Sequence, residues 1–141
     1  MERRQLIFGS IATVAASASL NHLGNLLGSG EAFASTNNDK LLATTAKCIT
    51  TGLQCINLCR KELAKGDKAM AECLSTVTDM LAACEALQKL AANESPHLPA
   101  MAKVCQKALQ DCAKSCEPHA KHMSECRACM DACRECEKAC A

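Results

Sequence analysis

The positions of the cysteines constrain this chain more than any other feature of its sequence. Thirteen of the 141 residues are cysteines, and the last five recur at alternating steps of three and four residues. Such steps keep side chains on one face of an α-helix, whereas a strand places every second residue on a face. The pattern predicts one inward seam of a C-terminal helix, made of His119, His122, Cys126, Cys129, Cys133, Cys136 and Cys140.

Four segments rich in Ala, Leu, Lys and Glu predict helices at residues 39–65, 67–92, 99–116 and 118–140. Gly66 suits a left-handed helix cap and Asp67 a helix start, while prolines near residues 96–99 and 118 mark the other two breaks. Short connections make consecutive helices antiparallel. With two Phe and neither Tyr nor Trp, the core must be built largely from aliphatic and sulfur side chains. We therefore predict an all-α, up-down-up-down four-helix bundle with a cysteine-lined core.

The first 34 residues predict a targeting segment. Arg3-Arg4 precede a weakly apolar stretch, and Ala32-Phe33-Ala34 form a candidate cleavage box. The arginine pair resembles a twin-arginine export signal, with an ordinary secretory signal or a membrane anchor as alternatives. We expect a signal peptide at residues 1–34 and a mature domain at 35–141 without a membrane span, in the periplasm or another extracytoplasmic compartment.

Cysteines at bundle-core positions indicate that the sulfur itself is used, because Cys there buries less apolar area than Leu or Ile. Neighbours on one helix face have Cβ atoms about 5–6 Å apart, whereas a disulfide requires about 3.5–4.5 Å. The cysteines of one helix therefore do not bridge each other without distortion, and an odd total leaves one unpaired. A structural protein stapled by disulfides between helices stays open as an alternative.

Thiolates are soft ligands that suit Cu(I), Zn(II) and iron–sulfur clusters. Four thiolates around Zn(II) leave two negative charges per site, which is costly in a dry core, whereas one Cu(I) per thiolate sums to zero. The cysteine runs typical of iron–sulfur sites are absent from the sequence. The charge balance favours Cu(I), with zinc or cadmium sequestration as an alternative. The net charge of +1, with both signs interleaved, does not indicate nucleic acid, and no catalytic arrangement stands out, so we expect no enzyme.

One end of the predicted bundle collects weaker ligands. The turn at Gly66 and the break at Pro118 lie at the same end, which predicts an entrance for copper lined by Met70, His119, His122 and Met123. The alternative is that the methionines fill gaps and the histidines are exposed. At the opposite end, Met80, His97 and Met101 suggest a second opening.

The pattern resembles the bacterial copper storage proteins, in particular an exported, twin-arginine branch. The resemblance rests on Cys-x6-Cys-x3-Cys at 48–59, Met-Ala-Glu-Cys at 70–73, the stretch 81–90, and Glu-Cys-Arg-Ala-Cys at 125–129 leading into Cys-Arg-Glu-Cys at 133–136. It implies a tetramer of four-helix bundles that stores many Cu(I) ions; no copper-accepting enzyme or chelator is indicated. The ligands it implies are Cys48, Cys55, Cys59, Cys73, Cys84, Cys105, Cys112, Cys116, Cys126, Cys129, Cys133, Cys136 and Cys140. Glu62 and Lys65 stand where relatives can carry methionines, so His119, His122 and Met123 would replace them.

Overall fold

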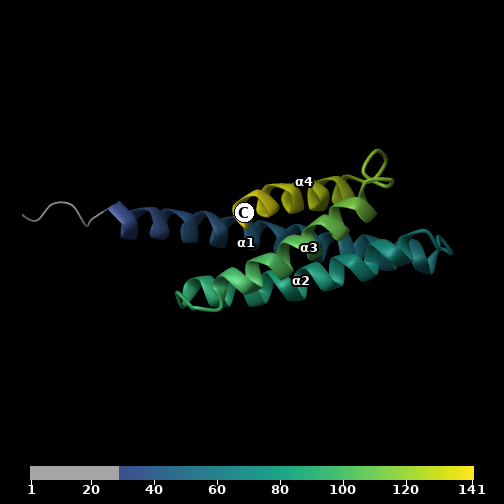
Figure 1. Cartoon of the computed structure of the whole chain (residues 1–141). Coiled ribbons are helices and arrows are strands. Elements are labelled where there is room, and N and C mark those ends of the chain that lie inside the picture. The colour runs from purple at the N-terminus through teal and green to yellow at the C-terminus, as the bar shows by residue number, and fades with distance from the viewer. Residues whose placement is uncertain (1–28) are drawn as a thin grey trace, which may run out of the picture.

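The regular structure of the described part of the chain is helical. The computed structural model describes residues 29–141, with side chains from residue 37 onward. Its helices are α1 (Ser29–Ala64), α2 (Met70–Ala92), α3 (Leu98–Cys116) and α4 (Ser124–Ala139). Each helix packs against the next in the chain, and α4 packs back against α1 (Figure 1). The predicted antiparallel four-helix bundle is confirmed.

The turn between α1 and α2 is built as the sequence predicts. Gly66 has a φ of 97°, its N–H donates to the Leu63 carbonyl at 2.9 Å, and the Asp67 N–H donates to the Glu62 carbonyl at 3.0 Å. These two bonds form the Schellman motif, in which glycine is favoured because it lacks a Cβ. Asp67 accepts a backbone hydrogen bond within the turn, and α2 begins only at Met70.

The start of α1 differs from the prediction. The sequence predicts a helix from residue 39, but the helix begins at Ser29 and runs through Ser-Thr-Asn-Asn at 35–38. The intrinsic penalties of Ser, Thr and Asn are below about 1 kcal/mol per residue, and extending a formed helix is cheap. The predicted domain boundary after residue 34 therefore lies inside α1.

The start of α4 also differs. Residues 117–123 form hydrogen-bonded turns that continue from α3, and Met123 is extended with φ −126° and ψ 111°, so that α4 begins at Ser124 and not at Pro118. The Arg127 Nε–H donates to the Ala120 carbonyl at 2.9 Å and ties the turns to α4. His119 and His122 consequently lie in this connection and not on the helical seam of cysteines.

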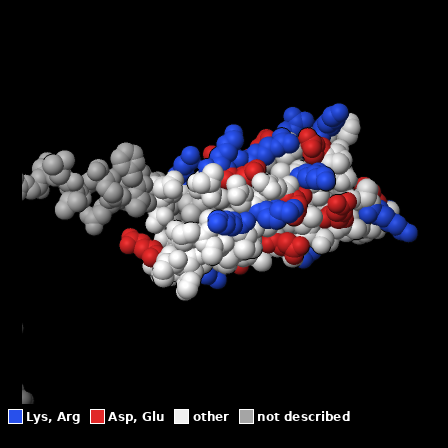
Figure 2. Space-filling view, viewed as in Figure 1, with Lys and Arg blue, Asp and Glu red and all other residues white. Residues whose placement is uncertain are grey.

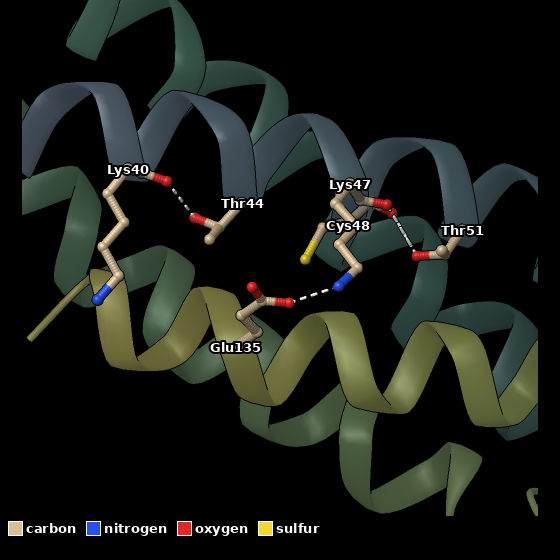
Figure 3. A network of polar contacts seen from close by, with 6 residues as sticks. All are labelled: Lys40, Thr44, Lys47, Cys48, Thr51 and Glu135. Atoms are coloured by element: carbon tan, nitrogen blue, oxygen red, sulfur yellow. Dashed lines mark hydrogen bonds and ion pairs between the residues drawn. The ribbon is translucent and has the colours of Figure 1, made fainter.

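The surface and the helix contacts are ordinary for a small bundle. Lys and Arg are interspersed with Asp and Glu on the face shown in Figure 2. Lys47 on α1 pairs with Glu135 on α4 at 2.5 Å, beside Cys48 (Figure 3). No helix among residues 29–141 is long and apolar enough to cross a membrane.

Candidate metal centre

The interior of the bundle is lined with sulfur. Twelve of the thirteen cysteine side chains have no exposed surface, and Cys140, at the end of α4, is half-buried. Steps of three, four, seven and eleven residues hold the cysteines of each helix on its inward face. The hydrocarbon part of this core is thin, and Leu87, Leu109 and Val77 are its largest fully buried aliphatic side chains. The sequence-predicted cysteines are therefore brought together in one core.

Cysteines of different helices approach each other closely near the His119 end of the bundle. The Sγ atoms of Cys73 and Cys116 are 3.5 Å apart, and that of Cys55 lies 3.8 Å from Cys73 and 3.9 Å from Cys126. A disulfide bond is about 2.05 Å long, and all thirteen cysteines, which lie within residues 29–141, are free thiols. The structure thus gives no support to the disulfide-stapled alternative.

Further along the bundle, the sulfur contacts continue. The Sγ atoms of Cys112 and Cys129 are 3.7 Å apart, and those of Cys84 and Cys105 are 3.6 Å apart. Four groups of three thiols have all their Sγ atoms within 4.8 Å of one another: Cys55/Cys59/Cys73, Cys55/Cys116/Cys129, Cys112/Cys129/Cys133 and Cys48/Cys84/Cys136.

These groups fit a soft ion with few ligands. Metal–sulfur bonds of about 2.3 Å place three sulfurs about 4.0 Å apart in a planar site, which is close to the spacings present. Each group holds three sulfurs, one fewer than a tetrahedral thiolate site for zinc requires. The donor set and its spacing therefore suit ions that accept two or three soft ligands.

Hydrogen bonds among the thiols divide them into proton donors and acceptors. The bond from Cys55 is the largest cause that lowers the pKa of Cys59, to about 4. Bonds from Cys140 and Cys84 lower the pKa of Cys105 to about 5. Conversely, the pKa of Cys84 lies well above the usual value, mainly because Cys84 forms a hydrogen bond with Cys105. Each such bond favours the thiolate form of the accepting sulfur and the thiol form of the donor, and a bound metal takes the place of the shared proton.

His119 is the histidine that the structure brings to the thiols. The pKa values of Cys59 and Cys126 are lowered first by hydrogen bonds from other cysteines and also by the charge of His119, which therefore lies near both. His119 is half-buried and borders an open groove of about 970 Å³ between α2 and α3, whose lining includes Glu72 and Asp111. His119 is therefore a partly exposed side chain near the buried thiols of Cys59 and Cys126.

The other predicted entrance residues differ in burial. Met70 has no exposed surface, Met123 is half-buried and packs against the core, and His122 is exposed. Within the connection, the His122 N–H donates to the His119 carbonyl at 3.1 Å. Three of the four predicted entrance residues therefore adjoin the core, and His122 lies outside it.

The predicted second opening is not where the sequence suggests. His97 is exposed, but Met80 has no exposed surface and its Sδ lies 3.6 Å from the Sγ of Cys84. Met80 is an interior residue that the sequence interpretation placed at a rim. Its spacing of four from Cys84 and seven from Cys73 puts all three on one helix face, so the sequence also indicates the interior position that the structure shows.

Comparison with known proteins identifies the family of this chain. The family model described as copper storage protein matches residues 34–141. The chain belongs to the copper storage protein family. Copper storage in a cysteine-rich helical bundle, as predicted from the sequence, is confirmed by this match. No curated protein sequence matches the chain.

Two solved structures of copper storage proteins from Streptomyces lividans share the fold. One, described as copper loading to a cytosolic protein with five coppers, is 23% identical with a TM-score of 0.71 and covers 77% of this chain and 92% of its own. The other, loaded with 10 copper equivalents, is 24% identical with a TM-score of 0.69 and covers 84% and 89%. At these identities the likeness supports the four-helix fold of this chain.

The comparison corrects the predicted location. The sequence interpretation placed the protein in the periplasm or another extracytoplasmic compartment, whereas the similar protein is described as cytosolic. A core of free thiols is chemically suited to the reducing cytosol, where disulfides are rare. The prediction of an extracytoplasmic location is therefore wrong by this comparison. Arg3-Arg4, on which it rested, lie outside the described residues.

Proposed function

We propose that the chain stores copper as Cu(I), bound by the thiolates of its thirteen cysteines at up to about one ion per cysteine. The observation that carries this proposal is the buried set of free thiols at 3.5–4.0 Å from one another, drawn from all four helices. One Cu(I) per thiolate leaves no net charge in the core, whereas four thiolates around one Zn(II) leave two negative charges per site. The role is binding and release, without a catalytic step.

An anaerobic titration tests this proposal. The fully reduced protein is titrated with Cu(I) against a chromogenic Cu(I) chelator, and bound copper and free thiols are counted together. We expect saturation near the number of thiols and no tight binding after the thiols are alkylated. Saturation at about four ions or fewer would contradict a multi-copper store. Zinc or cadmium retained against excess Cu(I) would favour the sequestration alternative.

The His119 end of the bundle is the proposed entrance. Imidazole and thioether groups bind Cu(I) more weakly than thiolates, so His119, Met70 and Met123 pass ions inward to the thiols near Cys59. His122, which is exposed, would act as the outermost ligand. Replacing the first three residues together should slow loading and leave the capacity nearly unchanged. The matched control is His122→Ala, with a smaller effect; an equal loss of capacity in the triple variant would contradict the gate.

We also propose that the chain forms a homotetramer, as its family resemblance implies. Leu53 on α1 and Val104 on α3 are more than half exposed, at 56% and 59%, and they lie on helices that do not contact each other, so we assign them to two separate contacts with neighbouring copies. Light scattering coupled to gel filtration measures the mass in solution. Replacing either residue by Glu should dissociate the assembly, and a monomeric wild-type protein would refute it.

Residues 1–34 are proposed to be a removable leader, which leaves the bundle domain at 35–141. The support is the weakly apolar stretch that ends in the candidate cleavage box Ala32-Phe33-Ala34. The intact mass of protein isolated from its own cells tests the proposal. A mass that corresponds to the full chain would exclude cleavage after Ala34.

A further inference from the structure

The sulfur lining has a gap where α1 packs against α2. The inward positions of α1 include Cys48, Gly52, Cys55 and Cys59, so that a glycine interrupts the thiols. On α2, Cys73 and Cys84 are eleven positions apart, which is about 16 Å along the helix at 1.5 Å per residue. The gap on α1 and the gap on α2 face each other across the α1–α2 contact.

Met80 fills this gap from α2. A Cβ built on Gly52 would lie 2.9 Å from the Met80 Cε and 2.9 Å from a methyl carbon of Leu81. The absence of a side chain at Gly52 therefore makes room for the end of Met80. The thioether sulfur, in turn, accepts a hydrogen bond from the Cys84 thiol at 3.6 Å. The methyl group and the sulfur of Met80 are thus placed by two separate contacts, and the side chain has no exposed surface.

This placement brings a thioether to one of the three-thiol groups. Cys84 belongs to the group whose other members are Cys48 and Cys136. A thioether is a soft ligand without charge, so it raises the number of ligands around Cu(I) and adds no negative charge to the core. Two metal–sulfur bonds of about 2.3 Å span the 3.6 Å between Cys84 and Met80 at an angle of about 100°. Copper can therefore replace the thiol proton of Cys84 with little movement of either sulfur.

We propose that Met80 is a copper ligand inside the bundle, acting together with Cys84 at the Cys48/Cys84/Cys136 group. The inference rests on the proposed storage of Cu(I) by the thiols and adds one internal ligand of a different kind. Gly52 is the positioning residue for this site, because its missing Cβ holds open the space for the Met80 side chain. Without a metal role, Met80 would be a flexible filler of the core.

Selenium spectroscopy tests the assignment directly. The full chain with Met70→Leu and Met123→Leu, which removes the proposed entrance thioethers, is labelled with selenomethionine and loaded with Cu(I) under anaerobic conditions. We expect X-ray absorption at the selenium edge to show a copper neighbour. Adding Met80→Leu, which keeps the volume of the side chain, should remove that neighbour, whereas adding Met130→Leu, a half-buried position on α4, should leave it unchanged.

Two results would overturn the assignment: a copper-loaded protein without a selenium–copper neighbour, or one whose selenium–copper signal survives Met80→Leu. A protein that binds no copper at all would instead refute the proposed storage function, so the two failures are distinguishable. The circular dichroism of the Met80→Leu protein confirms that the helices are intact. As a second variant, Gly52→Ala should weaken the selenium–copper signal and leave every thiol in the chain, and an undiminished signal would refute the role of Gly52.

Discussion

Two helices of the bundle end in the same motif but with different residues at its left-handed position. After α1 this residue is Gly66, with a φ of 97°, and after α2 it is Glu94, with a φ of 49°. The Glu94 N–H donates to the Ala91 carbonyl at 3.1 Å, and the Ser95 N–H donates to the Leu90 carbonyl at 3.0 Å. The chain therefore contains both a favourable and an unfavourable version of one cap.

The structure gives the sign and the size of two substitutions. A residue with a Cβ costs about 1–2 kcal/mol in the left-handed region, and the greater freedom of glycine in the unfolded chain offsets about 0.4–1 kcal/mol of this. Glu94→Gly should thus stabilise the bundle by about 0.5–1 kcal/mol. Gly66→Ala should destabilise it by a similar amount, and because no atom lies within 4 Å of the added Cβ, this cost is conformational and not steric.

Thermal unfolding of the reduced, metal-free protein measures both effects. Each kcal/mol corresponds to about 4–8 °C in Tm for a domain of about 100 residues. Glu94→Gln is the matched control, because it removes the negative charge at the end of α2 and keeps the Cβ. A Tm change of the same sign for Glu94→Gly and Gly66→Ala, or a gain in Glu94→Gln equal to that in Glu94→Gly, would refute the reasoning.

Three further outcomes follow from the packing and the thiols. The hydrogen bond of Cys84 to Cys105, together with burial, holds the pKa of Cys84 above the usual 9.0. The stability that Cys84 contributes is therefore present below pH 9.0 and is lost above it, by about 1.4 kcal/mol per pH unit. The Tm of the reduced metal-free protein should fall in alkaline buffer, and a constant Tm would contradict this. Replacing both Lys47 and Glu135 by Ala should change the unfolding free energy by less than about 1 kcal/mol in denaturant titrations, because both are about half exposed, and a larger loss would show a stronger link between α1 and α4. Leu109→Ala, at a position without exposed surface, should cost about 2–5 kcal/mol in the same titrations, and a smaller cost would mean that the core collapses around the cavity.

The fold was predictable because the signals that specify it are local. Cysteines and aliphatic residues at steps of three and four place the inward face of each helix, and Gly66 marks the end of α1 by a conformation that other residues avoid. Helix starts were less predictable. Ser, Thr and Asn before residue 39 oppose a helix too weakly to stop one, and Pro118 begins a helix as readily as it enters a turn.

The parts of the site that the sequence did not specify depend on contacts between helices. The helical periodicity places Cys84 and Met80 on one face, but only the close approach of α1 at Gly52 turns the thioether into the core. In the same way, the Cys48/Cys84/Cys136 group takes one thiol from each of α1, α2 and α4. A copper ion held by such a group joins helices that are far apart in the chain, so binding free energy becomes folding free energy. Copper loading should therefore raise the Tm of the bundle, and a loaded protein that melts at the temperature of the metal-free form would show that its thiols bind copper without joining the helices.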